Sequence, residues 1–130
     1  VVDDSIVRGS TASTIIEYIR RVGKAKEVHM RVASPPVYGP CFYGIDMKTI
    51  DELFVQKFTD KQDLQPRTLR EMARRLGANT VAYLTLEPFI TALNLPRDNI
   101  CLGCLTTEYP TEKGRKLYQI QSQGRRKRTG

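Results

Sequence analysis

The chain has 130 residues and a mass of 14.8 kDa, enough for one domain and too little for two ordinary ones. Hydrophobic residues make up 40% of the sequence and charged residues 27%, which excludes a disordered or membrane-embedded protein. No apolar run approaches the roughly 20 residues of a membrane span, and no signal peptide opens the sequence, so we expect a cytoplasmic protein without membrane partners. Three cysteines cannot all pair within one chain, which excludes a disulfide scaffold.

The net charge of +7 is confined to the end of the sequence. Residues 1–112 hold 14 basic and 14 acidic side chains, so the whole excess lies in residues 113–130. A basic run at a terminus is typically solvated and mobile. We therefore predict a basic, mobile tail over 113–130, with an arm that binds a polyanion as the alternative.

The first predicted element is a strand that is only partly present. Val1 and Val2 are the apolar residues before an acid pair, whereas strands average about 5–6 residues. We therefore interpret the chain as the C-terminal piece of a longer protein. Helical spacing of apolar residues then predicts a helix over 12–22, and alternation predicts a strand over 27–33. Prolines and glycines make 34–46 a loop.

The second half of the sequence continues the alternation. Thr49 and Glu52 form a capping box, which predicts the start of a short helix. The further predicted elements are a helix over 66–76, a strand over 80–85, a helix over 87–93 and little regular structure from Asn94 onward. This order predicts an α/β fold with a mainly parallel sheet flanked by helices, incomplete at its N-terminal side and ending in an irregular segment. We divide the chain into a domain over 1–93, a cysteine-bearing segment over 94–112 and the tail.

An acid pair, Asp3-Asp4, stands at the carboxyl end of the first strand, and the loop after it leads into a helix. Neighbouring carboxylates accept hydrogen bonds from two adjacent sugar hydroxyls or from water on Mg²⁺. The free N–H groups of a helix start suit a phosphate, and Gly9 lets the backbone approach it closely. Ser10 and Thr11 add hydroxyl donors. The residues alone fit a ribose 5-phosphate site and equally an Asp-Ser turn with no ligand.

Several stretches of the sequence resemble one enzyme family. Residues 1–11 resemble the phosphoribosylpyrophosphate (PRPP) motif of type I phosphoribosyltransferases, in the form found in glutamine phosphoribosylpyrophosphate amidotransferases. The likeness continues in the same order through 28–36, 40–46, 101–104 and 108–111. The resemblance implies that the α/β fold is the C-terminal half of a type I phosphoribosyltransferase domain.

The same resemblance implies roles for the residues of the first motif. Asp3 and Asp4 would contact the ribose hydroxyls and the Mg²⁺ of bound PRPP. The other PRPP-binding residues, which form the loop around the 5-phosphate, would be Ser5, Ile6, Val7, Arg8, Gly9, Ser10 and Thr11. Ser10 stands where the family more often has threonine, and both supply a hydroxyl. No catalytic residue is assigned within this chain.

Cys101 and Cys104 form a C-x-x-C pair, and Cys41 lies 60 residues before the first of them. From the residues alone the pair fits a zinc half-site, a redox pair or two buried thiols. His29 is then either a fourth zinc ligand or, as a lone histidine more often is, a hydrogen-bonded structural residue. The resemblance implies instead that the three cysteines bind a 4Fe–4S cluster whose fourth ligand lies outside this chain. Such a cluster would tie the C-terminal region to the body of the protein and would be sensitive to oxygen.

The resemblance also implies an activity, the first committed step of purine nucleotide synthesis. The family reaction converts PRPP, glutamine and water into 5-phosphoribosylamine, glutamate and pyrophosphate, with ammonia supplied by a glutaminase domain that this chain lacks. We expect the complete enzyme to be a homo-oligomer and this chain alone to be inactive. The alternatives are a salvage phosphoribosyltransferase, a PRPP-sensing regulator whose tail contacts nucleic acid, and a zinc-stapled binding module.

Overall fold

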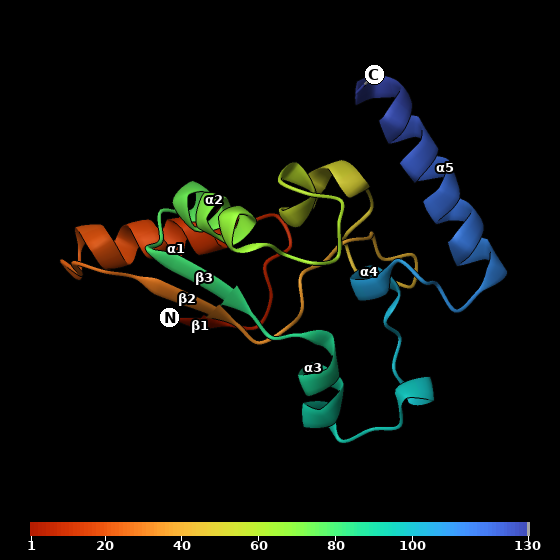
Figure 1. Cartoon of the computed structure of the whole chain (residues 1–130), viewed down its shortest axis with the longest axis horizontal. Helices are drawn as coiled ribbons and strands as arrows, with labels where there is room; N and C mark the ends of the chain where they lie inside the picture. Colours follow the sequence, from red (N-terminus) through yellow and green to blue (C-terminus); the bar gives the residue numbers. More distant parts are fainter. Residues whose placement is uncertain (130) are drawn as a thin grey trace.

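The computed structural model describes residues 1–129, in which a parallel sheet of three strands is the central element (Figure 1). The strands, in their order across the sheet, are β1 (Val2–Asp3), β2 (His29–Val32) and β3 (Thr80–Tyr83). Both pairings are parallel, with Val2 opposite Arg31 and Arg31 opposite Ala82. The predicted α/β fold with a mainly parallel sheet is confirmed, and β2 and β3 are shorter than the alternating pattern predicted.

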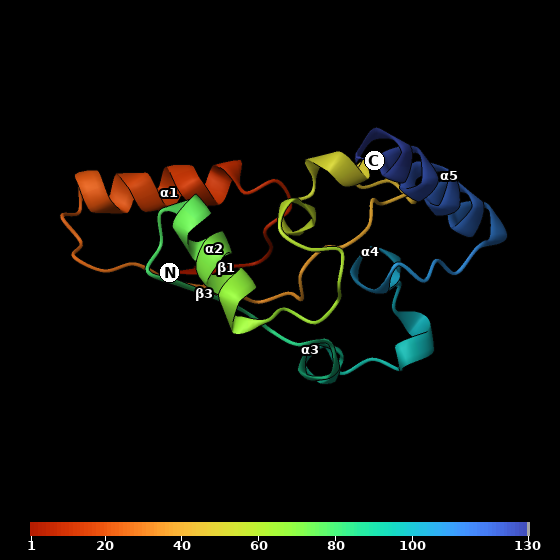
Figure 2. The same ribbon diagram turned by 45° about the horizontal axis from the view of Figure 1, so that its top comes forward.

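Two helices cover one face of this sheet (Figures 1 and 2). They are α1 (Ser10–Arg21) and α2 (Pro66–Leu76), which lie beside each other over the strands. Because side chains alternate along a strand, Met30 and Val32 of β2 are buried in the core while His29 and Arg31 are exposed. The helical side chains buried in the same core are Ala12, Ile16, Met72, Ala73 and Leu76.

The predicted ends of the second helix and the predicted capping box are confirmed. Pro66 is the first residue of α2, and Gly77 ends the helix with φ 82°, in the left-handed region that favours glycine. Thr49 and Glu52 form the capping box of a single 3₁₀ turn, η1 (Ile50–Glu52). A second turn, η2 (Val55–Lys57), follows it, and Leu53 between the two turns is fully buried.

After β3 the chain runs away from the sheet through further helices (Figure 1). These elements are α3 (Leu86–Leu93), the 3₁₀ turn η3 (Arg97–Asn99), α4 (Gly103–Thr106) and α5 (Glu112–Thr129). Helix α3 confirms the helix predicted over 87–93. The prediction of little regular structure from Asn94 onward is wrong, because α4 and α5 follow. None of the helices in residues 1–129 has the length and apolarity that crossing a bilayer demands.

Helix α5 occupies the segment 113–130 that we predict to be a basic, mobile tail, of which Gly130 lies outside the described residues. Glu112 in its first turn pairs with Lys116 at 2.6 Å, a spacing that supports helices. The helix also docks on η1 and η2: Gln121 donates to the carbonyl oxygen of Lys48 at 2.7 Å, and Arg125 to that of Gln56 at 2.6 Å. These partners are 73 and 69 residues away, so the composition of the tail did not predict them. The boundaries after residues 93 and 112 stay predictions.

A buried tyrosine joins the C-terminal segment to the loop over 34–46. Tyr109 is 3% exposed, and its hydroxyl donates to the carbonyl oxygen of Pro40 at 2.7 Å. Its ring centroid lies 4.9 Å from that of Phe42 and 5.5 Å from that of Tyr118 on α5, the spacing of favourable aromatic pairs. Burial is the main cause that raises the pKa of Tyr109 above its usual value. This cluster of rings holds the loop and the C-terminal segment against each other.

Candidate functional site

The predicted PRPP-binding residues line one cavity at the carboxyl end of β1. Residues 3–12 enclose a volume of about 250 Å³ between the end of the strand and the start of α1. Ligands of open α/β sheets bind beyond the carboxyl ends of the strands, which is where this cavity lies. The structure therefore brings together every residue that the sequence singled out from Asp3 to Thr11 and adds Ala12.

The two aspartates bond to the backbone and also keep acceptor capacity. Asp3 Oδ1 accepts the N–H of Asp4 at 3.1 Å, and Asp4 Oδ1 accepts the N–H of Ser5 at 2.8 Å. Such short-range bonds are typical of the turn that was the ligand-free interpretation of this segment. Each carboxylate has a second oxygen, Oδ2, for which no partner is found within residues 1–129. A turn and a ligand site are therefore compatible in the same residues.

Gly9 begins helix α1 at the wall of the cavity. It is the N-cap residue, with φ 84° in the left-handed region. The N–H of Ser13 donates to its carbonyl oxygen at 3.0 Å, which is the first bond of the helix. The N–H groups of Ser10, Thr11 and Ala12 come before that bond and have no intrahelical acceptor, as at any helix start. Together with the positive end of the helix dipole they suit an anion such as a phosphate.

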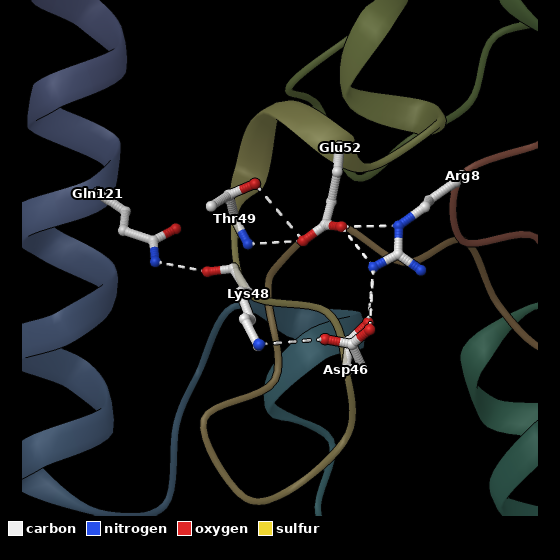
Figure 3. Close-up of polar contacts among 6 residues, drawn as sticks. All are labelled: Arg8, Asp46, Lys48, Thr49, Glu52 and Gln121. Carbon is white, nitrogen blue, oxygen red and sulfur yellow. Dashed lines mark hydrogen bonds and ion pairs between the residues drawn. The ribbon is translucent and has the colours of Figure 1, made fainter.

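The Arg8 side chain is held by residues of a distant segment (Figure 3). Its Nε donates to Glu52 Oε2 at 2.7 Å, and its Nη2 donates to the carbonyl oxygen of Asp46 at 2.8 Å. The N–H of Thr49, and after it the Arg8 guanidinium, hold the pKa of Glu52 below its usual range. The sequence pointed to Glu52 only as a helix cap, because a contact across 44 residues leaves no local pattern.

Two of the three cysteines pack against the same small cluster of buried apolar side chains. Cys41 and Cys104 contact this cluster, whereas Cys101 is exposed. Burial is the main cause that raises the pKa of the Cys104 thiol, and the nearby thiols of Cys41 and Cys101 raise it further. In residues 1–129 no group of three His, Cys, Asp or Glu side chains is arranged to hold a metal ion. Cys41 and Cys104 thus share one apolar cluster, and Cys101 lies three residues before Cys104 in the chain.

His29, the alternative fourth zinc ligand, is hydrogen-bonded at the start of the central strand β2. Its Nδ1 lies 3.0 Å from Thr80 Oγ1 on β3, and its Nε2 lies 3.0 Å from Glu27 Oε2. Both ring nitrogens therefore have partners that are not cysteines. This confirms the interpretation of His29 as a hydrogen-bonded structural residue.

Known proteins match this chain along most of its length. The amidophosphoribosyltransferase of Archaeoglobus fulgidus is 43% identical over 112 residues, which are 85% of the chain. Those of Methanocaldococcus jannaschii and Bacillus subtilis are 41% and 38% identical over 112 and 116 residues, each covering 86% of the chain. The chain corresponds to a segment of an amidophosphoribosyltransferase. It spans about a fifth of the length of these relatives, and no protein-family profile matches it.

Gly9 of this amidophosphoribosyltransferase segment gives a stability prediction. A Cβ at this position would lie 2.6 Å from the Phe54 ring, on a backbone whose φ of 84° is rare for L side chains. We expect Gly9→Ala to lower the free energy of unfolding by about 2–4 kcal/mol, because left-handed backbone costs roughly 1–2 kcal/mol and the ring must also move. Denaturant unfolding of the wild type and of the Gly9→Ala variant measures this difference in the free energy of unfolding.

The matched control for this prediction is Gly77→Ala. Gly77 has nearly the same φ, 82°, but its Cβ would lie in ordinary contact, 3.6 Å from Ile16. The control should therefore lose only the backbone part, about 1–2 kcal/mol. Equal losses in the two variants would show that Phe54 does not constrain the loop at Gly9.

Proposed function

We propose that this chain is the PRPP-binding part of an amidophosphoribosyltransferase that begins purine nucleotide synthesis. The complete enzyme converts PRPP, glutamine and water into 5-phosphoribosylamine, glutamate and pyrophosphate. The observation that carries the proposal is the cavity. Its wall consists of the motif residues from Asp3 to Thr11, in a chain 38% to 43% identical to amidophosphoribosyltransferases.

Different residues of the cavity bind different parts of PRPP. Asp3 and Asp4 offer carboxylate oxygens to the two ribose hydroxyls and to the water shell of Mg²⁺, whose preferred ligands are oxygens. The N–H groups at the start of α1, with the hydroxyls of Ser10 and Thr11, bind the 5-phosphate. The ion itself would neutralise the charge of the pyrophosphate leaving group.

The chemistry at the ribose C1 makes few demands on proton transfer. Ammonia attacks C1 as pyrophosphate leaves, so the site must hold the ribose in position and stabilise developing charge. Residues 3–12 do the first of these tasks by fixing both the hydroxyls and the phosphate of one ribose. A glutaminase domain of the complete enzyme supplies the ammonia, and we expect that enzyme to be a homo-oligomer.

The cysteines fit an iron–sulfur cluster by the chemistry of their donor set. Cys41, Cys101 and Cys104 are all free thiols, and thiolates are the ligands of 4Fe–4S clusters. Their two segments already touch, since the N–H groups of Tyr38 and Gly39 both donate to the carbonyl oxygen of Cys104 at 2.9 Å. A bound cluster would supply a structural cross-link between these segments.

The proposed function is tested on the complete protein that contains this chain. With PRPP, Mg²⁺ and ammonia it should release pyrophosphate and form phosphoribosylamine, and with glutamine in place of ammonia it should also form glutamate. Chelation of Mg²⁺ should stop phosphoribosyl transfer, and added Mg²⁺ should restore it. Transfer to a free nucleobase in place of ammonia would indicate a salvage phosphoribosyltransferase and contradict the proposal.

The chain by itself should be inactive. It supplies one wall of the ribose phosphate site, and by resemblance the residues that cover the pyrophosphate belong to another part of the enzyme. We expect residues 1–130 to release no pyrophosphate above background from PRPP and ammonia, under conditions in which the complete protein turns over. Steady turnover by the chain alone would show that residues 3–12 suffice for the reaction.

A further inference from the structure

Residues 7–9, in the middle of the predicted phosphate-binding loop 5–11, contact one short segment, residues 46–54, at three successive positions. The carbonyl oxygen of Val7 accepts the N–H of Phe54 at 2.7 Å. The guanidinium of Arg8 bonds to Glu52, and Gly9 lies against the Phe54 ring. Residues 7–9 thus take their position from a distant segment, with Arg8 contacts that span 38 and 44 residues, as well as from α1.

Glu52 makes the strongest of these attachments (Figure 3). Its Oε2 lies 2.7 Å from Arg8 Nε and 2.6 Å from Arg8 Nη2, while its Oε1 accepts the N–H of Thr49 at 2.8 Å. The Glu52 side chain is only 21% exposed, against 46% for Arg8. A charge-assisted, two-point contact with a partly buried carboxylate is stronger than an ordinary surface ion pair. One carboxylate therefore caps η1 and holds the loop arginine at once.

Contacts from two sides fix the segment that carries Glu52. Gln121 of α5 donates to the carbonyl oxygen of Lys48, next to Thr49 (Figure 3). The N–H of Cys41 donates to the carbonyl oxygen of Met47 at 2.8 Å. The segment that carries Glu52 is consequently held in place by α5 and by the loop around Cys41, so that Glu52 can in turn hold Arg8.

The carboxylates around Arg8 indicate the role of this arginine. Its guanidinium is compensated by Glu52 and, at 3.7 Å, by the exposed carboxylate of Asp46. Hydrogen bonds to Glu52 and to the Asp46 carbonyl oxygen occupy Nε and Nη2 (Figure 3). An arginine engaged in this way fixes the shape of the loop, and the N–H groups of the loop and of α1 are left to bind the phosphate.

We propose that Glu52 is a positioning residue of the phosphoribosyl site: it acts through Arg8 to hold residues 7–9 in the shape that binds the 5-phosphate. The proposal rests on the proposed function, because it assumes that the cavity binds PRPP. It assigns Arg8 the role of a tether in place of a phosphate ligand.

A double-mutant cycle on the complete protein tests the tether. Glu52→Gln keeps an oxygen for the Thr49 N–H but removes the charge that holds Arg8. We expect it to raise the KM for PRPP about tenfold with a change in kcat of less than about twofold, since it weakens binding and leaves the reacting atoms alone. Arg8→Gln should have the same effect, and the double variant should be no worse than either single one, because both remove the same contact.

The matched control is Glu71→Gln on α2. Glu71 also pairs with an arginine, Arg67, at 3.1 Å, but on the exposed surface away from the cavity. This variant should leave the KM for PRPP unchanged. An unchanged KM in Glu52→Gln, or an Arg8→Gln effect about a hundredfold larger than that of Glu52→Gln, would overturn the tether in favour of a free or phosphate-binding arginine.

A second measurement needs no PRPP and separates this proposal from the proposed function. Amide hydrogen exchange over residues 5–11 reports how firmly the loop is held. We expect exchange there to be about tenfold faster in Glu52→Gln than in the wild type or in Glu71→Gln. If the loop responds in this way but the wild type does not use PRPP, the proposed function fails and the tether stands. Unchanged exchange overturns the tether whatever the ligand is.

Discussion

Replacing both aspartates of the acid pair by asparagine is expected to abolish ammonia-dependent phosphoribosylamine formation in the complete enzyme. We expect a loss of at least about 10³-fold, because the Asp3→Asn, Asp4→Asn variant keeps the shape of the site but loses both charges toward Mg²⁺ and the ribose. Asparagine Oδ1 can still accept the backbone N–H groups that the two aspartates now accept, so the turn itself should persist. Glutamine hydrolysis without PRPP stimulation should continue, since by our proposal it takes place in a separate glutaminase domain.

The control for this variant changes the same number of charges elsewhere. Asp60 and Asp63 lie in the segment between η2 and α2, outside the cavity, and Asp60→Asn with Asp63→Asn should keep full phosphoribosyl transfer. The measurement is pyrophosphate release with saturating ammonia, together with glutamate release as a test of folding. Retained transfer in the first double variant would remove the acid pair from the PRPP site.

The features that could be predicted from the sequence are those carried by neighbouring residues. Met30 and Val32 alternate with exposed residues along β2, and Pro66 and Gly77 mark the ends of α2 through fixed backbone preferences. The cavity belongs to this class as well. Its wall is the continuous stretch 3–12, so the sequence could predict which residues meet there. Their role in binding PRPP rests on resemblance and stays a prediction.

The features that could not be predicted depend on residues that meet across long stretches of chain. Helix α5 has few apolar side chains and docks through Gln121 and Arg125 onto carbonyl oxygens 73 and 69 residues away. The Arg8 contact with Glu52 spans 44 residues, so no local sequence pattern around either residue predicts the contact. Periodicity and capping rules describe local backbone preference and contain no information about such partners.

The cysteines were predicted as a group only through resemblance, and their role stays a prediction. We expect the complete protein, purified without oxygen, to be brown and to contain about four irons and four sulfides per chain, as a cubane cluster requires. On exposure to air the colour should fade as the cluster is lost. Iron, sulfide and zinc content of the anaerobic protein is the measurement.

Cys101→Ser is the most informative variant for this prediction. The Cys101 side chain is exposed, so its replacement removes no core packing, whereas Cys104 is half-buried against the apolar cluster. If Cys101 is a ligand, the variant should lose the cluster and destabilise the C-terminal region as strongly as Cys104→Ser does. If the cysteines are only thiols, Cys101→Ser should change stability by less than about 0.5 kcal/mol, as surface substitutions usually do.

Zinc is the alternative metal that the measurement must separate from iron. The same thiolates would suit zinc, with water in the fourth position, since His29 is engaged by Thr80 and Glu27. Zinc would also make Cys101→Ser destabilising, so the variant alone does not distinguish the two metals. Sulfide does, because a zinc site contains none. Stoichiometric zinc without inorganic sulfide in the anaerobic protein would therefore contradict the cluster, whereas iron and sulfide that both disappear in Cys101→Ser would confirm it.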